Sequence, residues 1–179
     1  MGKEHFFLEL EPPEERLRRA PHVVIIGGGF AGVRACKALA NTEVRVTLID
    51  KRNFNLFQPL LYQVATGLVS KGDVATPLRQ LVGRQFNVQV LLGEVTQLNP
   101  QDKQIVFNNK SLSYDYLVLA TGSGSTYFGH EEWRSFAPPM KILEQAEQTP
   151  DPNARQFLQS VVIVGAGPTG CERQEPYLS

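Results

Sequence analysis

The stretch Val23–Gly32, VVIIGGGFAG, decides the fold of this chain. Its apolar, β-branched start predicts a strand and its glycines predict a turn. Apolar residues then recur at the spacing of a helix, at Val33, Cys36, Leu39 and Ala40. The next apolar run, VRVTLID at Val44–Asp50, has the composition of a strand buried on both faces of a parallel sheet. Strand, helix and strand together have the size of a βαβ unit.

The glycine turn has the pattern GxGxxG, in which each glycine has a physical task. Gly27 permits a tight turn after the strand, Gly29 lets a pyrophosphate approach the backbone, and Gly32 lets the helix pack close to the sheet. The helix that begins near Phe30 and Ala31 directs N–H groups and its positive dipole end toward that anion. We therefore predict that these five residues bind a dinucleotide cofactor.

Asp50 ends the second predicted strand, where a carboxylate accepts hydrogen bonds from ribose hydroxyls and disfavours a 2′-phosphate. Lys51, beside it, is also predicted to contact the cofactor. The alternative is an α/β domain without a nucleotide, whose glycines serve structure alone. The motif does not by itself choose between FAD and NAD.

Beyond Asp50 the elements are less regular. Residues 52–72 show no clean periodicity, and a helix is expected at about Asp73–Val82, although it contains Pro77. The stretches VQVLLGEVTQL, KQIVF and SYDYLVLATG predict a small antiparallel meander that returns to the main sheet. The expected fold class is α/β, a Rossmann-like domain with a parallel sheet and a small antiparallel β-meander.

A second glycine turn follows late in the chain, in SVVIVGAGPTG at Ser160–Gly170. Only the tail CERQEPYLS comes after it, whereas a βαβ unit needs roughly 30 residues. We therefore expect the first strand and turn of an incomplete second Rossmann domain. The predicted organisation is a charged lead-in at 1–21, a dinucleotide-binding domain at 22–123, a connector at 124–160 and the truncated domain at 161–179. Within the lead-in, EERLRR is expected to form a turn of helix. The connector is expected to contain a short helical stretch near Ile142–Glu147.

Composition excludes several classes of protein. Eighteen basic residues balance 18 acidic ones and 42% of the residues are hydrophobic, so neither a disordered chain nor a nucleic-acid partner is expected. Cys36 and Cys171 are the two cysteines and the three histidines are scattered, so we predict no metal site and no disulfide framework, and we interpret Cys36 as a small buried hydrophobe. The sequence shows neither a membrane-spanning stretch nor a secretory signal, and a cytoplasmic location is expected.

The segment Phe54–Arg79, FNLFQPLLYQVATGLVSKGDVATPLR, resembles the type II NADH:quinone oxidoreductases, which are single-subunit flavoproteins. Its FQPLLYQVATG part is far more specific than either glycine turn. The two turns and LVLATG at Leu117–Gly122 agree with this resemblance, which extends from about Pro21 to Glu172. The resemblance implies that FAD binds at the first turn and NADH at the second.

The same resemblance assigns the FAD contacts. The first glycine turn faces the pyrophosphate, Asp50 the adenosine ribose, and Val95 the adenine through its backbone. Thr121 and Gly122 lie along the cofactor, and the Gln58–Gln63 loop lies near the isoalloxazine ring. The alternatives are that Leu60, Leu61 and Tyr62 are core residues and that Val95 is merely strand core.

The resemblance also assigns the second turn and the reaction. Gly165, Gly167 and Gly170 begin the NADH domain, and Glu172, the expected catalytic residue, lies near the nicotinamide. Hydride then passes from NADH through FAD to a membrane quinone. The absence of a redox-active cysteine pair counts against disulfide reductases and sulfide:quinone oxidoreductases.

This sequence departs from that family after Glu172. The rest of the NADH domain, the quinone-site segment and the helices that hold the family on the cytoplasmic face of a membrane are expected but missing. The chain is therefore predicted to be incomplete and inactive alone. A non-catalytic FAD-binding remnant or interaction module, and an enzyme completed by a separately encoded half, stay open, as does a homodimer or association through the uncovered end.

Overall fold

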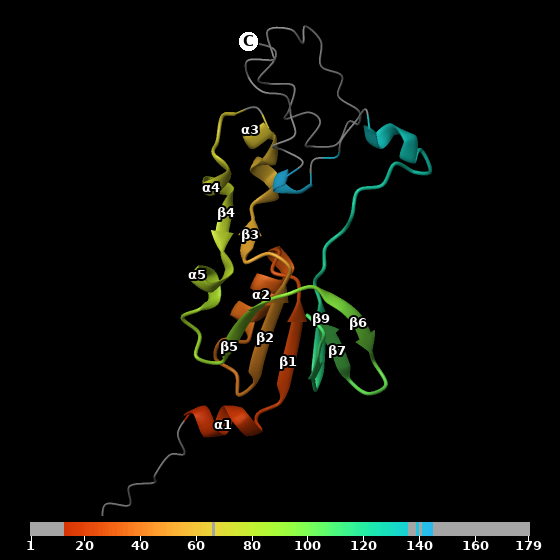
Figure 1. Cartoon of the computed structure of the whole chain (residues 1–179). Coiled ribbons are helices and arrows are strands. Elements are labelled where there is room, and N and C mark those ends of the chain that lie inside the picture. Colours follow the sequence, from red (N-terminus) through yellow and green to blue (C-terminus); the bar gives the residue numbers. More distant parts are fainter. Residues whose placement is uncertain (1–12, 66, 136–138, 140, 145–179) are drawn as a thin grey trace, which may run out of the picture. The chain divides into compact units, whose positions relative to one another are not determined.

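The computed structural model describes residues 13–65, 67–135, 139 and 141–144 (Figure 1). The chain divides into two units. The first unit contains the residues up to Asn53 together with Leu78–Thr121, and the second contains Phe54–Pro77 and the residues from Gly122 onward. The first glycine turn and Asp50 therefore belong to the first unit. In the described part of the chain, no helix has both the length and the apolar character to cross a membrane.

A four-stranded parallel sheet forms the centre of the first unit. Its strands lie in the order β5 (Val88–Leu92), β2 (Arg45–Asp50), β1 (His22–Ile26) and β9 (Tyr116–Leu119) (Figure 1). All five residues of β1 are buried, as are the four inner residues of β2. The predicted strands and the α/β class are thus confirmed. Because the strands are parallel, their carboxyl ends meet at one edge of the sheet.

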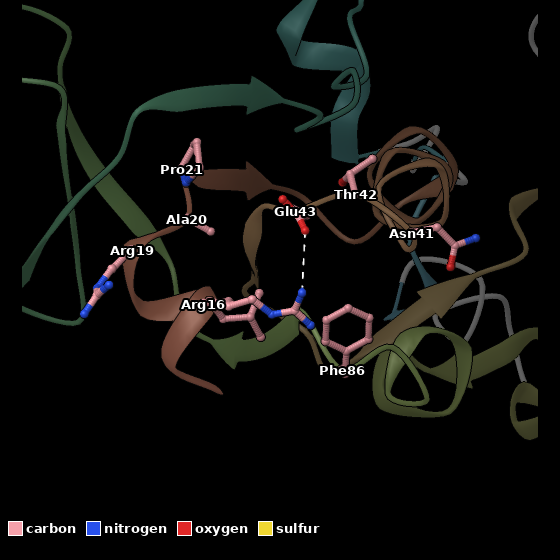
Figure 2. A pocket seen from close by; sticks show the side chains of 9 residues that line it. Arg16, Arg19, Ala20, Pro21, Asn41, Thr42, Glu43 and Phe86 are labelled. Carbon is pink, nitrogen blue, oxygen red and sulfur yellow. Dashed lines mark ion pairs between the residues drawn. The ribbon is translucent and has the colours of Figure 1, made fainter. Parts of the chain in front are cut away.

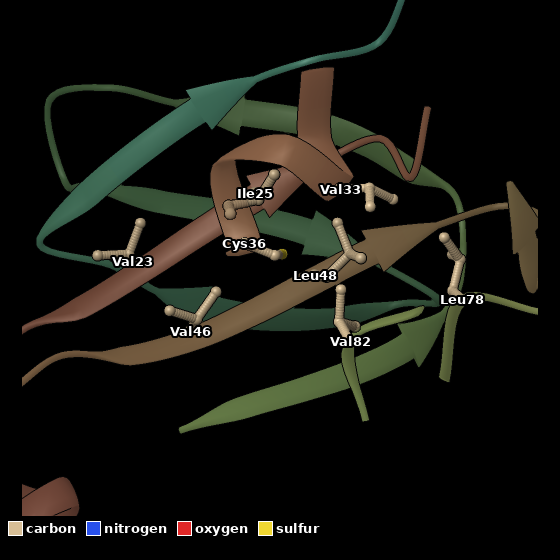
Figure 3. Close-up of a cluster of buried hydrophobic side chains, with 8 residues drawn as sticks. All are labelled: Val23, Ile25, Val33, Cys36, Val46, Leu48, Leu78 and Val82. Atoms are coloured by element: carbon tan, nitrogen blue, oxygen red, sulfur yellow. The ribbon is translucent and has the colours of Figure 1, made fainter. Parts of the chain in front are cut away.

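Two helices, α2 (Phe30–Ala38) and α5 (Leu78–Val82), cover one face of this sheet. Alternate side chains of β1 and β2 point into this layer because successive residues of a strand face opposite sides. Figure 3 shows the resulting core, which contains Val23, Ile25, Val33, Cys36, Val46, Leu48, Leu78 and Val82. Burial raises the pKa of the Cys36 thiol to about 11. The interpretation of Cys36 as a small buried hydrophobe is confirmed.

An antiparallel meander covers the other face. It consists of β6 (Val95–Asn99), β7 (Gln104–Phe107) and β8 (Lys110–Ser113). Ile105 of β7 is fully buried in one cluster with the sheet residues Val24, Ile26 and Ile49. The hairpin between β7 and β8 has Asn108 and Asn109 at φ +47° and +60°, as a two-residue turn of this kind requires. The first unit therefore has three layers: helices, parallel sheet and meander.

His22 joins these layers at the amino end of β1. Its Nδ1 lies 2.8 Å from the Ser113 carbonyl, which only accepts, so Nδ1 carries the proton. Its Nε2 then accepts from the Thr47 hydroxyl at 2.8 Å, and its backbone N–H donates to Asp115 at 2.6 Å. Burial and, secondarily, Arg45 lower the pKa of His22. A neutral histidine therefore ties β1 to β2 and to the end of the meander.

The helix predicted at Asp73–Val82 is wrong as a continuous element. The structure has α4 (Lys71–Val74), a short strand β4 (Ala75–Pro77), and then α5. Pro77 is the cause, because a proline lacks an N–H and restricts the residue before it to extended backbone. The α1 helix (Pro13–Arg19), by contrast, confirms the expected helical turn in EERLRR.

The assignment of VQVLLGEVTQL to the meander is correct only for its second half. Val88–Leu92 is β5 of the parallel sheet, paired with β2, and only Val95–Asn99 enters the meander. A corner at Gly93 separates the two: the Gly93 N–H donates to the Asp50 carbonyl at 2.8 Å. Apolar patterning predicts a strand, but it does not reveal which strand becomes its partner.

The second unit contains short elements. The strands β3 (Phe54–Leu56) and β4 pair antiparallel, and η1 (Gln58–Leu60) leads directly into α3 (Leu61–Ala65); η2 (Glu131–Ser135) lies farther along the chain. Leu61 and Ala65 are buried, with Leu56, Val64 and Leu143 packed against them. Leu61 is thus core, as one alternative expected. These elements were missed because three to five residues are too few to show a period.

Candidate functional site

The glycine turn connects the carboxyl end of β1 to α2. The Gly27 N–H donates to the Ile49 carbonyl at 2.8 Å, and Gly27 has φ +106°, which side-chain-bearing residues rarely adopt. A Cβ at Gly27 would collide with the Ala120 carbonyl. A Cβ at Gly32 would collide with the carbonyl of Gly27. The tight turn and the close helix approach that the motif predicts are therefore present.

The N-terminus of α2 opens beside this turn. Gly29 is its N-cap residue, in an extended conformation and without a side-chain cap, and the first turn of α2 contains no acidic residue. A Cβ built on Gly29 meets no atom within 4 Å. Phe30 and Ala31, which begin the helix, are exposed. The positive end of α2 thus faces open space next to Gly29, where an anion would be favoured.

Asp50 lies at the same edge, at the carboxyl end of β2. One carboxylate oxygen accepts from the Gly28 N–H at 2.5 Å and the other from the Arg52 N–H at 2.6 Å. A carboxylate has about four acceptor positions, so capacity for hydroxyl donors remains. The Gly28 contact, which sequence reasoning did not foresee, fixes Asp50 directly against the glycine turn.

The loop between β5 and β6 borders Asp50. Lys51 forms an exposed ion pair with Glu94, with Nζ and Oε1 4.0 Å apart. Val95, which follows, is partly buried against the meander core. Sequence reasoning missed Asn108, whose side-chain amide donates to the Leu92 carbonyl at 3.0 Å and holds this corner. In the sequence, the only indication of Asn108 is that asparagine tolerates the positive φ of a tight turn.

The predicted ATG contact follows β9. The Ala120 N–H donates to the Ile26 carbonyl at 2.8 Å, which continues β9 alongside β1 up to the glycine turn. Thr121 is exposed and is the last residue of the first unit. Gly122, which has φ +75°, begins the part of the chain that belongs to the second unit. Thr121 therefore lies at the same sheet edge as Gly27.

Gln58 belongs to the second unit. Its side-chain amide donates to the Lys141 carbonyl at 3.1 Å, and the Lys141 ammonium in turn donates to Gly124 and Ser123. Lys141 was not predicted, because a lysine between prolines and a short apolar run has no motif. The predicted residues Gly165, Gly167, Gly170 and Glu172 lie outside the described part of the chain.

A cavity of about 560 Å³ lies at the opposite, amino-end edge of the parallel sheet. Figure 2 shows the Arg16–Glu43 ion pair, 3.8 Å long, beside the exposed ring of Phe86. The cavity's other lining residues come from the end of α1 and from the turn before β2. In open α/β sheets, ligands bind outside the carboxyl ends of the strands. We therefore place the candidate site at the glycine turn and not in this cavity.

Comparison with known proteins shows the family of this chain. The profile of the pyridine nucleotide-disulphide oxidoreductase family matches residues 21–174. This chain belongs to that family. The family's name refers to disulphide chemistry. Among the described residues of this chain the cysteine is Cys36, which is buried and whose pKa is raised by that burial, so it is not a reactive thiol.

Two relatives of this chain are type II NADH:quinone oxidoreductases. Ndh of Mycobacterium tuberculosis is 41% identical over 184 residues, which cover 91% of this chain and 40% of Ndh. NdhA of the same organism is 43% identical, covering 84% of this chain and 36% of NdhA. The chain thus spans about two fifths of the length of these relatives. The resemblance stated from FQPLLYQVATG is confirmed.

Solved structures support the fold. NDH2 from Plasmodium falciparum in complex with NADH has a TM-score of 0.65 and 26% identity, covering 73% of this chain and 28% of NDH2. The sulfide:quinone oxidoreductase of Aquifex aeolicus has a TM-score of 0.62 and 26% identity, covering 89% of this chain and 33% of that protein. The Rossmann-like class is therefore confirmed.

The geometry of this family member fits part of a dinucleotide. The space beside Gly29 at the α2 N-terminus suits a pyrophosphate, and Asp50 can accept from ribose hydroxyls at the same edge. A side chain at Gly29 would enter this space, whereas side chains at Gly27 and Gly32 would break the turn itself. The residues present therefore suit the adenosine diphosphate half of such a cofactor.

Proposed function

We propose that this chain binds FAD at the glycine turn Gly27–Gly32 and functions in an NADH dehydrogenase that reduces a quinone. One observation carries the proposal: the Asp50 carboxylate is bound to the Gly28 N–H, beside the open space at Gly29. The identity to the Ndh and NdhA relatives supports the choice of reaction. Contact with a membrane surface, where quinones reside, belongs to the same proposal.

The predicted site residues of the first unit each have a defined task in this proposal. Gly29 leaves room for the pyrophosphate, and the N-terminus of α2, at Phe30 and Ala31, stabilises its charge. Asp50 accepts from the ribose hydroxyls, and its negative charge repels a 2′-phosphate. The backbone at Val95 faces the adenine. Lys51, which is paired with Glu94 at the rim of the site, also contacts the cofactor.

The remaining residues act toward the reactive end of the cofactor. Thr121 and Gly122 lie along it, and Gln58 is near the isoalloxazine ring. When bound, FAD supplies the two-electron chemistry that links NADH to a quinone. Gly165, Gly167 and Gly170 would hold NADH, with Glu172 near the nicotinamide. The protein's part is to bind, orient and exclude water.

Titration of the purified chain with FAD tests this proposal. We expect saturable binding, seen as a change in flavin fluorescence, and competition by ADP, which represents the adenosine half. Adenosine 2′,5′-bisphosphate should compete at least about tenfold less well than AMP, from which it differs by the 2′-phosphate alone, because that phosphate meets Asp50. Absence of saturable FAD binding by a folded chain would overturn the proposal.

Turnover tests the finer part of the proposal. The FAD-loaded chain is mixed with NADH and a short-chain ubiquinone analogue, and NADH absorbance is followed with and without the quinone. We expect FAD binding with little or no quinone-dependent NADH oxidation, because the sequence predicts a chain that is inactive alone. Quinone-dependent NADH oxidation at a rate typical of enzymes would overturn this prediction and would show that the chain performs the whole reaction.

A further inference from the structure

Lys141 connects two segments of the second unit that are far apart in sequence. Its ammonium donates to the Gly124 carbonyl at 2.8 Å and to the Ser123 hydroxyl at 3.2 Å. Its own carbonyl accepts from the Gln58 side chain at 3.1 Å, 83 positions away. One residue thus joins η1 to the chain that follows the ATG sequence.

The segment that receives the ammonium contains two glycines. Gly122 has φ +75°, and a Cβ built on Gly122 or on Gly124 meets no atom within 4 Å. Glycine backbone is intrinsically free, so a segment of this kind needs external contacts to adopt one conformation. Hydrogen bonds from a charged donor are stronger than neutral ones, which suits Lys141 to this task.

The chain around Lys141 is itself anchored. Leu143, two residues on, packs against the buried pair Leu61 and Ala65 of α3. Helix α3 continues directly from η1, which begins at Gln58. The backbone of Lys141 is therefore held from two directions, and its side chain transmits that position to Ser123 and Gly124.

We propose that Lys141 is a positioning residue of the FAD site, which fixes the Gly122–Gly124 segment relative to η1. This inference rests on the proposed function, because only that proposal places Gly122 and Gln58 beside the cofactor. Lys141 would act on the isoalloxazine end through these two segments. It would leave the adenosine end, held by Gly29 and Asp50, unchanged.

The test compares the affinities of the full chain for FAD and for ADP in the variant Lys141→Met. We expect FAD to bind about tenfold more weakly, as loss of charged hydrogen bonds implies, with ADP affinity unchanged. Lys141→Arg should restore FAD affinity and the visible absorbance of bound flavin, since arginine keeps the charge and the donors. The matched control Lys110→Met, an exposed position on β8, should behave as the parent chain.

The outcomes separate the two proposals. If the parent chain binds neither FAD nor ADP, the proposed function fails. If it binds both and Lys141→Met binds FAD equally well, or loses FAD and ADP in parallel, the positioning role is wrong. Should Lys141→Met not fold, as judged by circular dichroism, Ser123→Ala decides: a smaller loss of FAD affinity supports the role, and unchanged affinity contradicts it.

Discussion

The two edges of the parallel sheet in the first unit are built from the same strands but in opposite ways. At the carboxyl-end edge, the glycine turn leaves open space beside Gly29, and the site's polar groups are backbone amides and one carboxylate, Asp50. At the amino-end edge, beside the cavity of Figure 2, buried polar side chains bond to neighbouring elements. His22 bonds to Thr47 and Ser113, and Asn87 donates to carbonyls of the link between α2 and β2.

The difference teaches which polar residues serve stability and which serve binding. A buried polar group costs free energy unless it is bonded, and the His22 ring and the Asn87 amide nitrogen are bonded at the amino-end edge, whereas the buried Asn87 Oδ1 has no partner among the described residues. At the carboxyl-end edge the site faces open space beside Gly29, where a ligand can bond. Substitutions at the two edges should therefore have separable effects on stability and on FAD affinity.

The largest expected effect is that of Gly27→Val, which breaks the carboxyl-end edge. A side chain here collides with the Ala120 carbonyl and must adopt φ +106°. We expect a loss of about 3 kcal/mol or more in the free energy of unfolding, and no FAD binding. Chemical denaturation and FAD titration measure both. A folded variant with normal affinity would show that the turn does not have this geometry.

The next effect is that of Asp50→Ala, which removes the carboxylate from the site. FAD affinity should fall about 100-fold through loss of the ribose contacts, and the free energy of unfolding by about 1 to 2 kcal/mol through loss of the Gly28 and Arg52 bonds. Asp102→Ala, on an exposed turn of the meander, is the control. Parallel titrations that gave equal affinities for parent and Asp50→Ala would remove Asp50 from the site.

A smaller, purely structural effect is expected of His22→Ala at the amino-end edge. The variant should lose about 2 kcal/mol of unfolding free energy because Thr47, Ser113 and their neighbours lose a buried partner, while FAD affinity stays the same. The control is the exposed His130→Ala. Loss of FAD affinity in a folded His22→Ala chain would contradict the separation of the two edges.

The pH dependence sharpens this expectation. Burial and Arg45 lower the pKa of His22 in the folded chain below its ordinary value of 6.5, while Asp115 and the Ser113 hydrogen bond oppose this shift. Near and below pH 6.5 the unfolded chain therefore binds more protons, and stability should fall as the pH falls from 7 toward the lowered pKa. Denaturation at successive pH values should give a smaller decrease for His22→Ala. If the free energy of unfolding decreased equally with pH in the parent chain and in His22→Ala, His22 would not be the cause of the decrease.

The smallest effect is expected of Arg16→Ala, at the cavity of Figure 2. Its ion pair with Glu43 is 3.8 Å long and both side chains are more than half exposed, so we expect a change of at most about 0.5 kcal/mol. FAD affinity should not change. A large loss of FAD affinity would mean that the cavity, and not the glycine turn, is connected with binding.

The sequence predicts the carboxyl-end edge well because its residues act through the backbone. The turn at Gly27, the helix after it and the acid at Asp50 follow from spacing alone, and the parallel sheet follows from two buried runs. Local chemistry suffices there, since glycine and helix dipoles need no distant partner.

Contacts between distant residues could not be predicted. His22 and Ser113, Asn108 and Leu92, and Lys141 and Gln58 meet only because of the topology. The partner of Val88–Leu92 was misassigned for the same reason. The short elements between Phe54 and Pro77 were missed because three to five residues do not show a period, and β3 and β4 depend on pairing with each other.

Gly29→Asp tests the central claim most directly, because it should move stability and binding in opposite directions. Aspartate is a favoured N-cap residue and opposes the positive end of α2, so the melting temperature of the apo chain should not fall and is expected to rise by a few degrees. Its carboxylate would occupy the space assigned to the pyrophosphate, and FAD titration should show binding weakened about 100-fold or more. FAD bound with the parent's affinity by a folded Gly29→Asp chain would contradict the account.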